Sequence, residues 1–576
     1  MKRFFAILLI MQIMPGSGSL LGAESNGCSA APCLAPTASQ ASAMFSKLEQ
    51  LYPQLFYPGT LTQATMLGND SAFYRLYPST AQYGGLATYQ GGLWYQDKGQ
   101  WIRYKSLDAS DQQFCSTGCL AASIAEGAFR GSVVLGAPTT NSIKVSVFAA
   151  DQSGTLYLAY GTVSGTYLLQ TQPVNLVAGV PVVITLGNLD ANTGYFYRVI
   201  FKASDMPDAL PTSEHVFHTA RPPGSAFTFT LQADSHMDEN SVTSLYQRTL
   251  ANVLADHPDF HIDLGDTFMT EKHSGPLSAT VPPAATQSQV DERYRFERNN
   301  FAGLAQSVPL FLVNGNHEGE AGWLNTGTGD NLAIWTTKAR QRYFVNPLPD
   351  GFYSGDNANE PFVGKRASWY AWQWGDALFV VLDPFWNSGK TKGNDAWALT
   401  LGDSQYHWLE QVLGGSSAKF KFIFLHNLVG GLDGQMRGGI EAAPFFEWGG
   451  KEADGVTNGF AVKRPQWSAP IHQLLVNSGV TAVFHGHDHV YVNQQLDGIV
   501  YQEVPQPAAV NTSNGATIAR DYHYTSGTVV SSAGHLRVSV SANQVKVDYV
   551  RAWLPENENS QRKNGQIDHS WTLTKP

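Results

Sequence analysis

From Ser225 onward, short apolar runs alternate with amphipathic stretches. The apolar runs are FTFTLQAD, HIDLGD, PLFLVNGNHE, ALFVVLD, FKFIFLH and TAVFHGHDH, and later GIVYQEV, HLRVSVS and QVKVDYV. Runs of this length are typical of buried strands, whereas the stretches between them have the apolar period of helices. We expect helices near residues 242–256, 292–306, 404–413 and 470–478. Alternating strands and helices predict a layered α/β domain, to which we assign residues 225–555.

Residues 126–220 have a different pattern, with strands at short spacing and no helical stretch between them. The runs are SVVLGA, SIKVSVFAA, TLYLAYGT, VPVVITLGN, YFYRVIFKA and EHVFHTA. They predict a β-sandwich. LDANTGY, which ends at Tyr195, matches the tyrosine corner of immunoglobulin-like and fibronectin-like sandwiches. The RPPG stretch at 221–224 then reads as a linker to the α/β domain.

The flanking regions carry weaker patterns. Residues 24–125 predict a small accessory domain with a helix near 41–52 and short aromatic strands. Trp94, Tyr95 and Trp101 fit the core of that domain better than a glycan-binding platform, because aromatic side chains are commonly buried. Contact with a glycan or the cell surface stays a second interpretation of this region. Residues 556–576 are interpreted as a C-terminal tail.

The N-terminus has the pattern of a secretion signal. Lys2 and Arg3 precede an apolar run at 4–14, and small residues follow to Ala23. The run is too short to span a bilayer, and no other stretch is long and apolar enough to do so. We therefore expect a signal peptide at 1–23, with cleavage after Ser19 as an alternative, and a secreted or periplasmic protein without a transmembrane segment.

All four cysteines precede the β-sandwich. They are Cys28, Cys33, Cys115 and Cys119. An even number of cysteines in an exported chain predicts two disulfides, and three pairings are possible. A zinc site is the alternative, but the spacing of each pair matches zinc motifs poorly.

Composition narrows the class of protein. A chain of 576 residues is too long to fold around a single hydrophobic core, so we expect two to four domains. Its 55 glycines, 29 prolines and 12% aromatic residues favour loop-rich β structure over long helices. A net charge of −10 argues against a stable complex with nucleic acid. It does not argue against a phosphate ester, because bound metal ions supply local positive charge.

Metal-ligating residues follow five of the expected strands. The blocks are Asp234-x-His236, Gly265-Asp266, Gly315-Asn316-His317-Glu318, His426, and Gly486-His487-x-His489. Ligands in layered sheets gather at the carboxyl ends of strands, so these side chains should meet. Carboxylate, amide and imidazole groups suit a pair of ions roughly 3.5–4 Å apart, the arrangement that hydrolyses phosphate esters.

These five blocks, in this order, resemble the calcineurin-like metallophosphoesterase superfamily. The resemblance implies that the layers of residues 225–555 have the order α/β/β/α. The resemblance implies a first ion held by Asp234, His236 and His489. It implies a second ion held by Asn316, His426 and His487. Asp266 would bridge the two ions, and a hydroxide between them would attack phosphorus. His317 would lie outside the ligand set and bind a phosphoryl oxygen or protonate the leaving group.

Three further residues are candidates for supporting roles. Glu318 could orient its neighbours from behind the ligands. His485 precedes the Gly486 turn and fits such a role and plain packing about equally. Arg437 lies in a long loop, 428–467, which could shape substrate entry. Its guanidinium suits a phosphate, although a surface salt bridge is the more common role.

The sandwich ahead of the catalytic domain further resembles the purple acid phosphatase arrangement, with one departure. Those enzymes carry a tyrosine in GDxxY, whereas this chain has GDTFM with Met269 at that position. Those enzymes also lack the histidine of the Asp-x-His block, which is present here as His236. We therefore expect no tyrosine–iron bond. The ligand set leaves Mn, Zn, Fe and Mg open.

The expected function is hydrolysis of a small-molecule or nucleotide phosphate ester, with monoesters first and a phosphodiesterase or nucleotidase activity as the alternative. A non-catalytic binding protein is the third interpretation, and the complete ligand set argues against it.

Overall fold

The computed structural model describes residues 86–89, 92–97, 100–106, 128–237, 241–271, 284–391, 395–432, 435–509 and 511–575. The chain divides into two compact units, Met1–Glu126 and Gly127–Pro576. In the first unit, strands β1 (Leu86–Tyr89), β2 (Gly92–Asp97) and β3 (Gln100–Ser106) form an antiparallel sheet. The expected signal peptide, the helix near 41–52 and the four cysteines lie outside the described residues.

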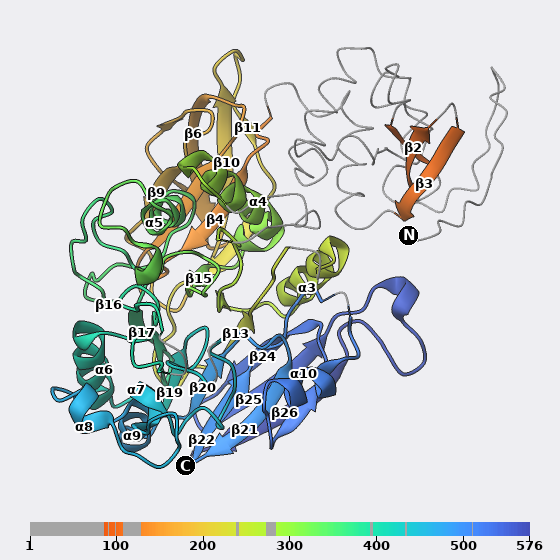
Figure 1. Cartoon of the computed structure of the whole chain (residues 1–576). Helices are drawn as coiled ribbons and strands as arrows, with labels where there is room; N and C mark the ends of the chain where they lie inside the picture. The colour runs from red at the N-terminus through yellow and green to blue at the C-terminus, as the bar shows by residue number, and fades with distance from the viewer. Residues whose placement is uncertain are drawn as a thin grey trace. The chain divides into compact units, whose positions relative to one another are not determined.

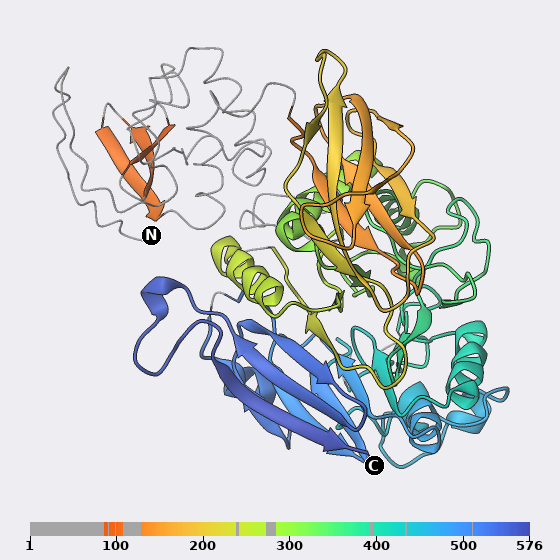
Figure 2. The same cartoon turned by 180° about the vertical axis from the view of Figure 1, so that it is seen from behind.

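The second unit contains two large sheets (Figures 1 and 2). The first has nine strands, in the order β26 (Ile567–Thr574), β25 (Gln544–Arg551), β24 (Gly534–Val540), β13 (Phe227–Gln232), β14 (Phe260–Asp263), β15 (Leu310–Leu312), β4 (Ser132–Gly136), β5 (Ile143–Phe148) and β9 (Val182–Leu186). The second has eight, in the order β16 (Ser354–Gly355), β17 (Tyr370–Trp374), β18 (Ala377–Val381), β19 (Phe420–Phe424), β20 (Ala482–His485), β22 (Ile499–Glu503), β21 (Tyr491–Leu496) and β23 (Thr528–Val530).

An aromatic core joins the two sheets face to face. Phe229 of β13 packs edge-on against Phe379 of β18, with ring centroids 5.0 Å apart. Phe260 of β14 likewise contacts Trp372 of β17, at 5.7 Å. Both faces of these central strands are buried, because helices cover the outer side of each sheet. Burial on both faces explains why the strands read as continuous apolar runs.

The helices complete four layers and confirm the predicted α/β/β/α architecture. The first sheet packs against α3 (Thr243–Ala255), α4 (Gln287–Ala305) and α5 (Leu332–Tyr343). The second packs against α6 (Asp403–Gly415), α7 (Phe446–Gly449), α8 (Phe460–Lys463) and α9 (Ile471–Asn477). Smaller elements are α10 (Gly515–Asp521), η2 (Gly322–Leu324) and η3 (Pro555–Asn557). Each described helix is too short or too polar to cross a bilayer.

The β-sandwich shares a sheet with the catalytic layers. One of its sheets is the β4–β5–β9 end of the nine-stranded sheet, where Gly136 pairs with Leu310 of β15. The other has six strands: β6 (Gly154–Gly161), β7 (Leu169–Gln170), β8 (Val174–Leu176), β10 (Gly194–Ala203), β11 (Leu210–Pro211) and β12 (His215–His218). Arg298 of α4 is buried and donates to Ser132 and Ser146 of the sandwich. The sandwich is therefore built into the catalytic unit.

Tyr195 has the contact that a tyrosine corner requires. Its hydroxyl accepts a hydrogen bond from the backbone N–H of Asp190, at 2.9 Å. Tyr195 is buried and its ring stacks on that of Phe217. The contact fixes the chain where it enters β10. The fibronectin-type classification of the sandwich stays a prediction.

The C-terminal interpretation needs a correction. Residues 556–576, interpreted as a tail, contain β26, which pairs with β25 along its whole length. Its polar sequence, IDHSWTLT, does not mark it as a strand because an edge strand leaves one face in solvent, and its residues alternate in exposure.

Helix α5 was also not predicted, because its buried face carries Thr336, Thr337 and Arg340 in place of apolar residues.

Candidate metal centre

All five metal-ligating blocks meet at one edge of the two sheets. Strands β13, β14 and β15 run parallel, as do β18, β19 and β20, so their carboxyl ends face the same way. Backbone hydrogen bonds link the loops that follow these strands: Asp234 N donates to Gly265 O at 2.9 Å, and Gly486 N donates to His426 O at 2.7 Å. These hydrogen bonds hold loops that are distant in sequence next to one another at the centre.

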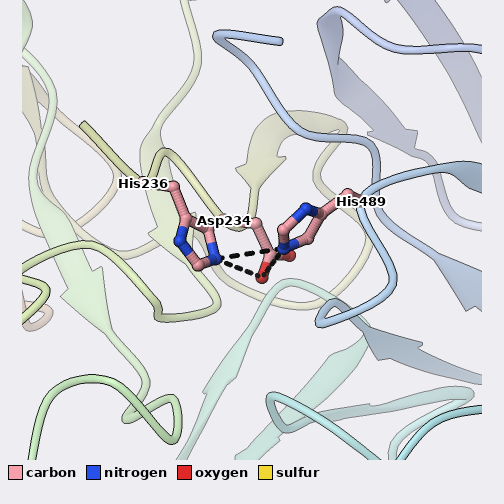
Figure 3. A group of neighbouring side chains, drawn as sticks. All are labelled: Asp234, His236 and His489. Carbon is pink, nitrogen blue, oxygen red and sulfur yellow. Dashed lines mark hydrogen bonds and ion pairs between the residues drawn. The ribbon is translucent and has the colours of Figure 1, made fainter. Parts of the chain in front are cut away.

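The first group is Asp234, His236 and His489 (Figure 3). Asp234 Oδ1 lies 3.6 Å from His236 Nε2 and 3.5 Å from His489 Nε2, and the two nitrogens are 3.0 Å apart. The three side chains point toward one another from two different loops, as the dashed lines in Figure 3 mark. One ion with ordinary bond lengths could contact all three atoms.

The second group is Asp266, His426 and His487. His426 Nε2 lies 3.2 Å from His487 Nδ1 and 3.2 Å from Asp266 Oδ2. The amide oxygen of Asn316 is 3.0 Å from the same nitrogen. The structure thus brings Asn316, His426 and His487 together, the set that the resemblance assigned to the second ion.

One oxygen of Asp266 lies between the two groups. Asp266 Oδ2 is 3.2 Å from His236 Nε2 in the first group and 3.2 Å from His426 Nε2 in the second. Its other oxygen accepts a hydrogen bond from the backbone N–H of His317, at 2.8 Å. A carboxylate oriented in this way could contact two ions with a single oxygen.

The atoms around the centre fit a pair of cations. Asp234 Oδ1 is buried and accepts a hydrogen bond from none of the described residues, although a buried carboxylate oxygen is costly to leave without a partner. His426 Nδ1 is 2.9 Å from Leu264 O, and His487 Nε2 is 2.6 Å from Gln435 O. Each contact places the proton on that nitrogen and leaves the lone pair of the other nitrogen facing the centre.

The electrostatics also favour positive charge. Burial lowers the pKa of His426, but the Asp266 and Asp234 carboxylates outweigh it and raise that pKa to about 9. Burial lowers the pKa of His489 to about 3. The carboxylates therefore attract a proton onto one imidazole, and a bound cation could take its place.

The backbone at the centre is strained. Five candidate ligands have positive φ: Asp234, His236, Asp266, His487 and His489. Such conformations cluster at functional sites. Gly265 and Gly315 allow the close approach of their loops, because a Cβ on Gly265 would lie 2.3 Å from Gly315 N and one on Gly315 would lie 2.3 Å from Asp266 Oδ1.

This geometry agrees with a known family. Residues 227–491 match the family described as calcineurin-like phosphoesterase. The chain carries a calcineurin-like phosphoesterase domain, and it is a metallophosphoesterase. No curated protein matches its sequence.

Two solved structures are similar to this chain at low sequence identity. The structure titled PhoD superposes on the phosphoesterase with a TM-score of 0.55 and 14% identity, covering 77% of this chain and 90% of that one. The purple acid phosphatase PPD1 of yellow lupin gives a TM-score of 0.47 and 15% identity, covering 77% of this chain and 74% of that one. The likeness to PhoD concerns the fold alone.

His317 of the phosphoesterase lies beside both groups. Its Nε2 is 3.1 Å from Asn316 Nδ2 and 3.9 Å from Asp266 Oδ2. Its Nδ1 is 2.9 Å from a carboxylate oxygen of Glu271, which the sequence analysis missed. Glu271 follows Asp266 by five residues in a loop, and no periodic pattern marks it.

Glu318 holds two of the loops from behind. Its carboxylate accepts backbone N–H groups from Asp266 at 2.9 Å, Thr267 at 2.6 Å and Phe268 at 3.2 Å, and from Gly315 as well. Burial and the Asp266 carboxylate raise the pKa of Glu318 to about 7, whereas the four N–H donors favour the ionised form. Glu318 therefore fits the supporting position for which the sequence made it a candidate.

His485 contacts Glu503 behind the Gly486 turn. Its Nδ1 lies 2.6 Å from Glu503 Oε2, and the other oxygen of Glu503 accepts the backbone N–H of Asp488 at 2.9 Å. Asp488 lies between the two ligands of the Gly486 turn. The supporting contact at this turn thus comes from Glu503, a β22 residue that sequence reasoning missed because its run reads as an ordinary strand.

Met269 and Arg437 have definite positions. Met269 is fully buried, and its carbonyl accepts a hydrogen bond from Arg293 at 2.7 Å. The absence of a tyrosine–iron bond stays a prediction. Arg437 is half-buried, and its guanidinium lies over the Tyr522 ring with its carbon 4.0 Å from the ring centroid.

Proposed function

We propose that this phosphoesterase hydrolyses phosphate monoesters at a centre of two divalent ions. The observation that carries the proposal is the position of Asp266 Oδ2, 3.2 Å from an imidazole of each group. Asp234, His236 and His489 would hold one ion, and Asn316, His426 and His487 the other. Mn, Zn, Fe and Mg all suit this donor set.

When bound, such ions neutralise charge on the phosphoryl oxygens and acidify a water that then attacks phosphorus. The chain's own residues supply orientation and a proton. His317 presents Nε2 to the centre, and Glu271 fixes the ring through Nδ1. A leaving alkoxide would take its proton from that Nε2 atom. Glu318 keeps the loops of Asp266 and Asn316 in place throughout.

The preference for monoesters rests on the β-sandwich ahead of the domain, an arrangement in which the sequence resembles purple acid phosphatases. Phosphodiesterase or nucleotidase activity at the same centre is the alternative. A binding protein without activity is disfavoured by seven converging ligands.

Export is part of the proposal. The basic start, apolar run and small residues of the first 23 positions support a cleaved signal and a secreted or periplasmic location. Mass spectrometry of the native protein would test this. A mature N-terminus near Glu24 is expected, and an intact Met1 in the fractionated cytoplasm would contradict it.

The substrate class is tested with p-nitrophenyl phosphate and bis-p-nitrophenyl phosphate. Both are offered to the full chain with added Mn, Zn, Mg or Fe, next to Asn316→Ala and the exposed control Asn359→Ala. The proposal predicts faster monoester turnover, lost in Asn316→Ala and kept in Asn359→Ala. Turnover of the diester alone would change the substrate class, and no turnover with any metal would overturn the proposal.

A further inference from the structure

The turn at residues 486–489 contributes one candidate ligand to each of the two groups. His489 belongs to the first group and His487 to the second, and only Asp488 separates them in the chain. A movement of this turn would therefore displace a ligand of both ions at once. The contacts that hold Asp488 thus bear on the geometry of the whole centre.

Three groups hold the buried residue Asp488. Its backbone N–H donates to Glu503 Oε1 at 2.9 Å. Its Oδ2 atom accepts a hydrogen bond from Gly438 N and another from the hydroxyl of Tyr524, both at 2.8 Å. Its Oδ1 atom is buried and accepts from none of the described residues. The carboxylate is therefore held through Oδ2, and Tyr524 supplies the side-chain donor.

Tyr524 is itself fixed by its surroundings. Its backbone N–H donates to Ala519 O of α10 at 2.9 Å, and its buried ring packs in one apolar cluster with Val490 and Val492, directly after the turn. Its hydroxyl also lies 3.5 Å from Glu503 Oε2. A side chain whose rotamer is locked by packing can hold a neighbour within a narrow range of positions. Tyr524 is therefore suited to fix Asp488.

We propose that Tyr524 is a positioning residue of the metal centre, which acts through Asp488 to fix the turn that presents His487 and His489. The inference rests on the proposed two-ion function. Tyr524 follows Asp488 by 36 residues and lies beyond the last of the five ligand blocks, so the sequence did not mark it. Residues that orient metal ligands in this way govern metal affinity without touching the ion.

The test is titration calorimetry of the full chain with Mn or Zn, in the absence of substrate. Tyr524→Phe removes one hydroxyl and keeps the packed ring, and it should weaken the binding of both ions about 10-fold. The matched control is Tyr406→Phe, because Tyr406 is also buried and its hydroxyl donates to Ala469 O at 2.6 Å, on helix α6. The control should lose stability in urea but keep its metal affinity.

A double-mutant cycle then tests whether Tyr524 acts through Asp488. In an Asp488→Ala background, Tyr524→Phe should change metal affinity no further. Unchanged metal affinity in Tyr524→Phe, an equal loss in Tyr406→Phe, or fully additive losses in the cycle would overturn the inference. Failure of the proposed function has a different signature, because the wild-type chain would then hydrolyse no p-nitrophenyl phosphate with any metal.

Discussion

The Nδ1 atom of His317 lies 2.9 Å from Oε1 of Glu271, and this contact orients the imidazole at the metal centre. With Nδ1 engaged, the Nε2 atom faces Asn316 and Asp266, where the leaving group of a substrate would lie. Glu271 is a positioning residue, because it acts on the reaction only through His317.

Replacing Glu271 by Gln should slow the reaction in proportion to how much the leaving group needs a proton. We expect kcat to fall about 10-fold or more for an alkyl phosphate and much less for p-nitrophenyl phosphate, since general acid catalysis contributes most where the leaving group is basic. The measurement is kcat across a series of monoesters with leaving groups of different pKa. The exposed Glu556→Gln is the matched control. A uniform loss across the series would show that Glu271 serves stability instead.

The four backbone hydrogen bonds of Glu318 predict a metal-affinity defect in Glu318→Gln. The new amide keeps one acceptor oxygen and turns an N–H group toward backbone donors, so about half of the contacts are lost. We expect metal affinity to fall about 10-fold to 100-fold, as for other residues that support ligands. Titration calorimetry with Mn or Zn would measure it, and unchanged affinity would contradict the assigned role.

Glu320 predicts a pH-dependent contribution to stability. It accepts from Arg340 Nη2 and from Arg366 Nη2, both at 2.9 Å, and all three side chains are buried. Burial raises the pKa of Glu320, but the two arginines outweigh it and lower that pKa from 4.5 to about 2. A carboxylate with a lowered pKa stabilises the fold above its unfolded pKa, near 4.5. That contribution is lost as the pH falls toward 2.

The matching experiment is urea unfolding of Glu320→Gln at pH 7 and at pH 3. We expect a loss of about 3 kcal/mol at pH 7, because the substitution leaves buried guanidinium groups without their anion. The difference from wild type should be smaller at pH 3, where part of the wild-type contribution is already gone. The half-buried Glu360→Gln serves as control. An equal difference at both pH values would speak against the depressed pKa.

Sequence patterns were sufficient to predict the layers of the catalytic domain and the residues that gather at the centre. Strands buried on both faces give continuous apolar runs, and parallel strands place their carboxyl ends together, so the five blocks could be expected to meet. The assigned ligands Asp234, His236, Asp266, Asn316, His426, His487 and His489 lie together in the structure, although their metal binding is still to be measured.

Contacts that depend on tertiary packing left no sequence signal. Glu271 and Glu503 resemble any loop or strand carboxylate until the loops come together. The sheet shared by the sandwich and the catalytic layers depends on the pairing of Gly136 with Leu310, across more than one hundred and fifty residues of chain. Edge strand β26 is half solvent-exposed, so its polar side masked it.

The central claim is that two ions, joined through Asp266, carry the reaction. Its most direct test is the metal content of the full chain, measured by mass spectrometry while p-nitrophenyl phosphate hydrolysis is followed through chelation and stepwise return of Mn or Zn. The account predicts about two ions per chain at full activity. It also predicts no activity after chelation, and a return of activity only as the second ion binds. Full activity in the chelated protein, or with a single ion per chain, would contradict it.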